Sequence, residues 1–185
     1  MSLSKFLAAS LIAAAAPFAA LAEDGVSPDR IVFGQVAAFD GPASALGTGM
    51  REGLMAAFQE ANSNGGVQGR TIELRTEDDG YEPDRSAKAV KAMIGSGEIF
   101  GMIGAVGTPT SKATQPITTA AGVPFVGPFT GAGFLRDPAH GNVVNVRATY
   151  AAETEAWISY LVTPFRPTRP NPRSFIRMTD SDGLA

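Results

Sequence analysis

The chain contains no cysteine, which excludes disulfides, zinc–thiolate sites and a cysteine nucleophile. Its only histidine, His140, lies in a stretch rich in Gly, Pro and Asn, where we interpret it as an ordinary loop residue. A Ser-His-Asp triad or a two-histidine metal site would have to be built around that single imidazole. We therefore expect a protein that is not an enzyme and that uses no metal and no cofactor.

The chain also lacks a large excess of charge of either sign, because it has 15 basic and 18 acidic residues and a net charge of −3. A nucleic-acid partner would require a basic face, so we expect none. Apolar residues make up 44% of the 185 residues and charged residues 18%. This composition is typical of a chain that folds around a packed core, and the length suits one domain of ordinary size.

The N-terminus has the pattern of a cleaved export signal. Lys5 provides a short positive region, residues 6–19 are apolar and uncharged, and Ala20-Leu21-Ala22 matches the small-x-small cleavage site. The apolar run is shorter than the roughly 20 residues that a membrane span needs, although a membrane anchor is the alternative interpretation. We expect cleavage after Ala22 and a periplasmic location.

After this segment, strand and helix patterns alternate. Short apolar or alternating runs predict strands, and apolar residues at helical spacing between Gly and Pro breaks predict helices. The predicted strands cover residues 31–37, 71–76, 100–103, 124–126 and 143–146, and the predicted helices cover residues 48–61, 83–94, 109–121 and 150–161. This order predicts an α/β fold with a doubly wound, mostly parallel sheet and helices on both faces.

Ligands of such sheets bind beyond the carboxyl ends of the strands. The loop after the third predicted strand, residues 104–111, is rich in small residues and ends with three hydroxyl side chains at a helix N-terminus, to which Thr108 and Thr110 belong. This arrangement suits a carboxylate, because the free N–H groups and the helix dipole attract an anion. Ordinary N-capping by one of the two threonines is the alternative. Neither a P-loop nor a GxGxxG pattern is present.

Two more loops reach the same edge of the predicted sheet. After the fourth strand, Phe129 has the bulk to wall a pocket and Thr130 the hydroxyl to bond a ligand, although a structural turn with a buried aromatic ring accounts for them equally well. After the first strand, residues 40–47 lie where they would cover the same mouth, unless they form a plain connection.

Asp78 and Asp79 end the second predicted strand. Paired carboxylates bind Mg²⁺ or perform acid–base work, but more often cap the following turn. An exported Mg²⁺-dependent enzyme, or a sensory domain of the same fold, is therefore the alternative function.

Several motifs together resemble the periplasmic binding proteins of the branched-chain amino-acid type. They occur in the order Asp40-Gly41-Pro42, residues 64–70, Asp78-Asp79-x-Tyr81-x-Pro83, residues 107–110, residues 123–131, Leu135-Arg136 and residues 145–150. The resemblance covers roughly residues 30–162. It implies a type I periplasmic-binding fold of two lobes. Such a receptor clamps an amino acid or similar small ligand, works as a monomer and delivers the ligand to an ABC permease in the inner membrane.

The resemblance also assigns a site. In the family, the loops after strands three and four hold the α-carboxylate and ammonium of the ligand, and the loop after strand one carries a large aromatic residue in some relatives. The matching positions here are Leu46, Thr108, Thr110, Phe129, Thr130 and Gly131.

The N-terminal pattern, the resemblance and the change in composition together divide the chain into a signal peptide at residues 1–22, a first lobe at residues 23–162 and an irregular tail at residues 163–185. The tail has four prolines and four arginines in 23 residues. Family members are about twice as long, so we expect an incomplete receptor. Permitted codons for residues 175–179, read in a shifted frame, encode the Tyr-Gln-Asp-Asp motif that the family has there. An out-of-frame tail is our hypothesis, and a natural Pro-rich tail is the alternative.

Overall fold

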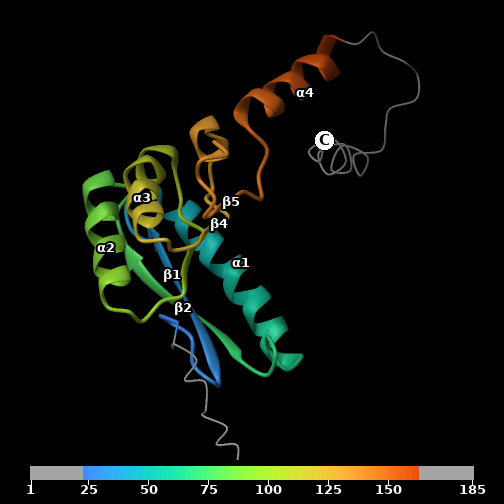
Figure 1. Ribbon diagram of the computed structural model, residues 1–185. Helices are drawn as coiled ribbons and strands as arrows, with labels where there is room; N and C mark the ends of the chain where they lie inside the picture. The colour runs from blue at the N-terminus through green and yellow to red at the C-terminus, as the bar shows by residue number, and fades with distance from the viewer. Residues whose placement is uncertain (1–22, 163–185) are drawn as a thin grey trace, which may run out of the picture.

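A computed structural model describes residues 23–162 of the chain. Five parallel strands form one sheet in the order β2-β1-β3-β4-β5, and helices alternate with them along the chain (Figure 1). The strands are β1 (Arg30–Ala37), β2 (Thr71–Asp78), β3 (Gly101–Ile103), β4 (Phe125–Val126) and β5 (Val143–Val144). The helices are α1 (Ser44–Ser63), α2 (Pro83–Gly95), α3 (Thr108–Ala120), the short 3₁₀ helix η1 (Gly133–Arg136) and α4 (Tyr150–Val162).

Strand β1 is the centre of the lobe, because it pairs in parallel with β2 along its whole length and with β3 on its other edge. Its side chains alternate between the two faces of the sheet, as the pleat requires. Phe33 points toward α1, where its ring lies 6.0 Å from that of Phe58. Gly34 faces α2, and a side chain there would collide with Met93 and Met102. The sheet is therefore covered from both sides, which confirms the predicted doubly wound architecture.

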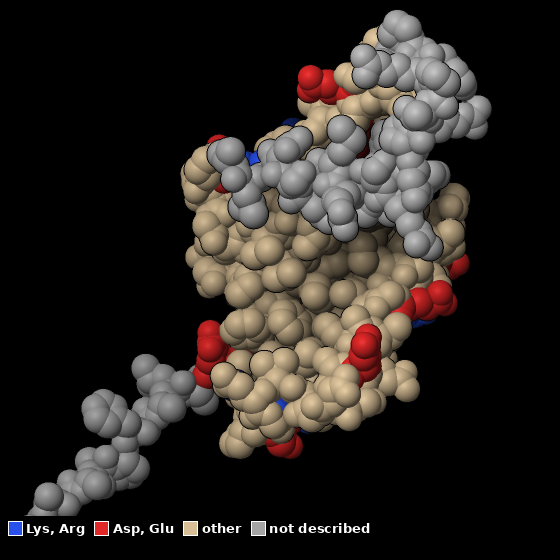
Figure 2. Space-filling model, turned by 90° about the vertical axis from the view of Figure 1, so that its right-hand side faces the viewer, with Lys and Arg blue, Asp and Glu red and all other residues tan. Residues whose placement is uncertain are grey.

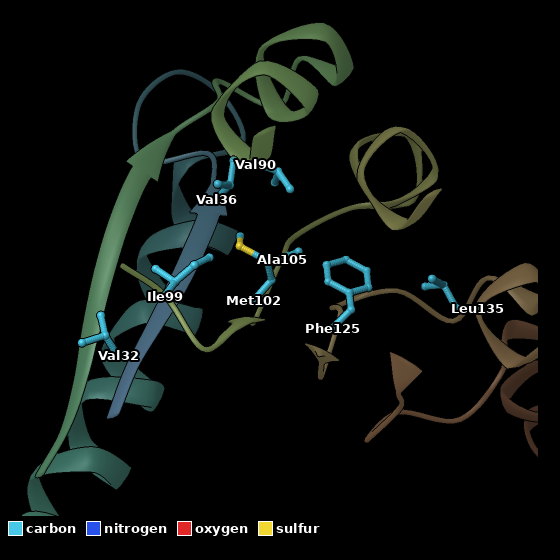
Figure 3. Packing of buried hydrophobic residues seen from close by; sticks show 8 residues of the cluster. All are labelled: Val32, Val36, Val90, Ile99, Met102, Ala105, Phe125 and Leu135. Atoms are coloured by element: carbon cyan, nitrogen blue, oxygen red, sulfur yellow. The ribbon is translucent and has the colours of Figure 1, made fainter. Parts of the chain in front are cut away.

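The apolar core lies on the α2 and α3 side of the sheet. Its buried members are Val32, Val36, Val90, Ile99, Met102, Ala105, Phe125 and Leu135 (Figure 3). Phe125 and Met102 are completely buried, and each such side chain contributes about 2–3 kcal/mol through the hydrophobic effect. The core thereby fixes the ends of β3 and β4, from which the loops of the candidate site begin.

The predicted elements are confirmed, with differences at their ends. The main one is α1, which we expected from Thr48 but which begins at Ser44. Gly47 is therefore a buried helical residue that packs against the Ala38 carbonyl, where a Cβ atom would lie 1.8 Å from the oxygen. The sequence places Gly47 at the end of the loop at residues 40–47, but close packing inside a helix is the actual reason for a glycine there. The single turn η1 was not predicted.

Helix α4 projects away from the sheet (Figure 1), and none of its residues is buried. Its exposed residues include Trp157, Ile158 and Leu161. On the side of the molecule shown in Figure 2, acidic and basic residues lie mainly toward the edges of the visible surface. Within residues 23–162, every helix is too short or too polar to cross a membrane. The predicted signal peptide and the irregular tail lie outside the described residues.

Candidate functional site

The loops after β3 and β4 run side by side because backbone hydrogen bonds continue beyond the two strands. The Phe129 amide donates to the Ala105 carbonyl at 2.7 Å, and the Gly107 amide donates to the Phe129 carbonyl at 3.4 Å. Val106 and Phe129 form a parallel bridge. This pairing brings the two threonines that follow, Thr108 and Thr130, to the same point at the edge of the sheet.

A cluster of three hydroxyl groups forms there, made by Thr108, Thr130 and Tyr150. The Oγ1 atoms of the two threonines are 2.6 Å apart. The Tyr150 hydroxyl lies 3.2 Å from the Thr130 Oγ1 and 3.4 Å from that of Thr108. Thr130 is buried, and its Oγ1 also accepts a hydrogen bond from the Ala132 amide at 3.2 Å. We call these three residues the hydroxyl cluster.

The hydroxyl cluster lies at the N-terminus of α3. Gly107 is the residue before the helix and has a positive φ of 102°, which favours glycine. The first N–H groups of a helix have no acceptor within it, and Pro109 removes one of them. Those of Thr108 and Thr110 remain, together with the positive end of the helix dipole. The local electrostatics therefore favour a negatively charged group.

Tyr81 covers the backbone of this helix start from the loop after β2. A Cβ atom added to Gly107 would lie 2.5 Å from the Tyr81 ring, so the glycine is needed for their close approach. Tyr81 itself has a φ of 68°, a left-handed conformation that is rare for an aromatic residue. Such strain is typical of functional positions, where the surrounding structure compensates for it.

Arg147 packs against two aromatic rings beside the hydroxyl cluster. Its guanidinium carbon lies 5.1 Å from the centre of the Phe129 ring and 5.3 Å from that of Tyr150. Two hydrogen bonds of 2.8 and 2.9 Å connect it to the Glu153 carboxylate. This pairing raises the pKa of Arg147 and lowers the pKa of Glu153. The guanidinium is therefore fixed against both rings by cation–π attraction.

Arg136, in η1, ties the loop after β4 to the chain that leaves β5. Its guanidinium donates to the Thr130 carbonyl at 3.2 Å, the Ala132 carbonyl at 2.8 Å and the Arg147 carbonyl at 2.6 Å. Burial and the nearby positive charge of Arg147 lower its pKa. The planar fork of an arginine suits this task, which a lysine cannot reproduce.

The structure brings together some of the predicted site residues. Thr108, Phe129 and Thr130 meet at the hydroxyl cluster, as described above. Thr110 is buried, and its hydroxyl donates to the carbonyls of Val106 and Gly107, so its side chain bonds the backbone. Leu46 belongs to the first turn of α1 and is 46% exposed.

Gly131 contacts Tyr150 directly. A Cβ atom at Gly131 would lie 2.6 Å from the Tyr150 ring, and the Gly131 carbonyl accepts the Tyr150 amide at 2.9 Å. Sequence reasoning assigned no place in the site to four residues of the family-like motifs, namely Tyr81, Arg136, Arg147 and Tyr150. The chain has only three tyrosines, and the concentration of two of them in motifs that lie beside the site was an available signal.

The two aspartates at the end of β2 cap the following turn. Asp78 accepts hydrogen bonds from the amides of Phe39, Asp40 and Gly80, and it forms an ion pair with Arg85. The hydrogen bond from the Phe39 amide is the main reason for the lowered pKa of Asp78. Asp79 accepts from the Tyr81 amide and the Ser86 hydroxyl. Within residues 23–162, no group of three or more His, Asp or Glu residues is placed to hold a metal ion. This geometry supports the capping interpretation of the pair.

Comparison with known proteins gives the same family from sequence and from structure. The model of the periplasmic binding protein family matches residues 30–170. The Leu/Ile/Val-binding protein BraC3 of Rhizobium johnstonii is 28% identical over 165 residues, which are 89% of this chain and 43% of that protein. The chain therefore spans less than half the length of this relative.

Solved structures agree. The crystal structure of a possible leucine/isoleucine/valine-binding protein from Rhodopirellula baltica is 40% identical, with a TM-score of 0.68 over 77% of this chain and 37% of that one. The branched-chain amino acid transporter substrate-binding protein LivJ of Streptococcus pneumoniae, in complex with isoleucine, is 22% identical. It shares the fold with a TM-score of 0.60, and the matched region is 65% of this chain and 34% of that one. The chain belongs to the periplasmic binding protein family, and its five-stranded parallel sheet is a lobe of the type I fold.

Proposed function

We propose that this chain is a ligand-binding lobe of the periplasmic solute-binding component of an ABC transporter, and that it binds an amino acid or a similar small carboxylate. The observation that carries the proposal is the pair of Thr108 and Thr130 hydroxyls, 2.6 Å apart at the N-terminus of α3. Hydroxyls and free helix N–H groups at one point are suited to a carboxylate. One relative named above is a Leu/Ile/Val-binding protein and another is a possible leucine/isoleucine/valine-binding protein, which supports an amino acid as the ligand.

The apolar parts of the site are suited to the side chain of such a ligand. Phe129 is 39% exposed beside the hydroxyl cluster, and Leu46 presents an aliphatic group from the first turn of α1. Gly131 leaves room for the chain that passes it, and Thr110 shapes the helix start through its backbone hydrogen bonds. We assign Leu46 and Phe129 to the ligand's apolar group, and Thr108 and Thr130 to its carboxylate.

A function of this kind requires a second lobe that covers the ligand and a permease that receives it. A binding protein with two lobes excludes water by closing them on the ligand and then docks on its permease. We propose that the protein acts outside the cytoplasm, as a monomer, with an ABC permease in the inner membrane as its partner. Affinity of the single lobe is expected to be lower than that of a receptor with both lobes, because one side of the ligand stays in water.

A thermal-shift screen tests the proposal. The chain is heated with L-leucine, L-isoleucine, L-phenylalanine or acetate, and each amino acid is paired with its primary amide as a matched control without the carboxylate. A ligand that binds only the folded state raises the unfolding midpoint by mass action. The proposal predicts a rise with at least one amino acid and a smaller rise with its amide. Equal midpoints with and without every compound would contradict it.

A further inference from the structure

Tyr150 is placed by the fold at the mouth of the proposed site. It is the first residue of α4, and its hydroxyl reaches the Oγ1 atoms of Thr130 and Thr108 at 3.2 and 3.4 Å. Tyr150 is nevertheless 45% exposed, so it is not simply part of the packed interior. A tyrosine with a satisfied hydroxyl on one side and open space on the other is suited to contact a ligand.

Two neighbours fix the position of this ring. Gly131 leaves no space between its own backbone and the Tyr150 ring, and its carbonyl accepts the Tyr150 amide. Arg147 lies against the ring at 5.3 Å from its centre and is itself held by Glu153. The ring is therefore oriented before any ligand arrives, which lowers the entropy lost on binding.

We propose that Tyr150 is a further ligand-binding residue, whose phenolic O–H donates to the carboxylate bound at the N-terminus of α3. This inference rests on the proposed function, because it assigns a third hydroxyl to that site.

The number of protons in the hydroxyl cluster agrees with this role. Three O–H groups supply three protons, and two internal hydrogen bonds are enough to connect three oxygens. One O–H then remains to donate to a ligand. Hydrogen bonds from Thr108 and Thr130 lower the pKa of Tyr150, and a more acidic phenol is a stronger donor to a carboxylate.

The experiment compares Tyr150→Phe with the unsubstituted full chain by calorimetric titration with L-leucine and with L-leucinamide. The variant keeps the ring, the backbone hydrogen bond and the contact with Arg147, and loses only the hydroxyl. Tyr160→Phe is the matched control, because Tyr160 lies on the same helix, about 15 Å farther along its axis. We expect Tyr150→Phe to weaken L-leucine binding about tenfold and L-leucinamide binding less than twofold. The control variant should change neither.

A purely structural role for Tyr150 predicts the same weakening for both compounds, and this result would overturn the inference. Unchanged L-leucine binding in Tyr150→Phe would overturn it as well, while leaving the proposed function intact. If the unsubstituted chain binds none of L-leucine, L-isoleucine and L-phenylalanine, the proposed function and the inference fail together.

A second measurement needs no substitution of Tyr150 in the protein that is titrated. With ¹³Cζ-labelled tyrosine, the chain gives signals from its three tyrosines, which the Phe variants assign. The inference predicts that L-leucine moves the Tyr150 signal more than that of Tyr160. A Tyr150 signal that stays in place at saturating L-leucine contradicts it.

Discussion

Replacement of Thr130 by valine removes the central oxygen of the hydroxyl cluster and keeps the shape of the side chain. Thr130 is completely buried, and its Oγ1 atom serves Thr108 at 2.6 Å, Tyr150 at 3.2 Å and the amide of Ala132 at 3.2 Å. Thr108 and Tyr150 are accessible enough to bond water instead. The Ala132 amide is buried and loses its side-chain acceptor.

The size of the effect follows from these partners. A buried donor without an acceptor costs about 1–3 kcal/mol, and the added methyl group returns part of that through burial. We expect Thr130→Val to lower the free energy of unfolding by about 2 kcal/mol. For a folded region of this size, this corresponds to a fall of about 7 °C in the unfolding midpoint. L-leucine binding should weaken at least tenfold in the same variant, because the Tyr150 hydroxyl loses the hydrogen bond from Thr130 that orients it toward the carboxylate.

Urea unfolding followed by circular dichroism measures the change in stability. Thr76→Val is the matched control, since Thr76 is an exposed residue of β2 where the same substitution is expected to change stability by less than about 0.5 kcal/mol. If Thr130→Val unfolds at the same urea concentration as the unsubstituted protein, the hydroxyl cluster does not hold the loop after β4 in place and the reasoning is refuted.

Substitutions at three further positions give distinct results in the same unfolding assay. Arg136→Ala leaves four carbonyl groups without their donor and should cost about 3 kcal/mol, of which Arg136→Lys recovers less than half. Equal stability of the Ala variant, the Lys variant and the original chain would contradict this role of Arg136. Gly131→Ala places a Cβ atom 2.6 Å from the Tyr150 ring, so we expect the free energy of unfolding to fall by about 2 kcal/mol and L-leucine binding to weaken. Unchanged stability of this variant would show that the ring is free to move. Asp78→Asn should lower stability at pH 7 by about 1 kcal/mol. The folded-state pKa of Asp78 is lowered, so its stabilisation is present above the unfolded pKa and lost as the pH falls through the folded pKa. The difference between the two proteins should therefore narrow below about pH 4, and a constant difference contradicts this assignment.

Much of the fold follows from local patterns in the sequence. The strand around Val32 to Val36 is apolar except for the buried Gln35, because a central parallel strand is covered on both faces. Pro83 and Pro109 mark helix starts because proline lacks the N–H group that the first turn leaves unpaired. The start of α1 was wrong by one turn, because Gly47 has the same sequence signal whether it ends a loop or permits close packing inside a helix.

Much less of the site follows from local patterns. Thr108 and Thr130 were predicted because each follows a strand whose end lies at the ligand-binding edge of a parallel sheet. Arg136 and Tyr150 were not, because their importance comes from contacts with residues far along the chain that no local pattern records. Arg136 bonds the carbonyl of Arg147, and Tyr150 bonds the hydroxyl of Thr108. Only the pairing of β3, β4 and β5 brings these partners within reach.

The central claim is that the hydroxyl cluster at the start of α3 binds the carboxylate of an amino acid. A ¹H–¹⁵N NMR titration of the labelled chain with L-leucine tests it most directly, since each backbone amide reports on its own surroundings. We predict saturable shifts of the amides of Thr108, Thr110, Thr130 and Gly131, with little change in the turn at Asp78 and Asp79. No saturable shift, or shifts confined to that turn on addition of Mg²⁺, would contradict the account.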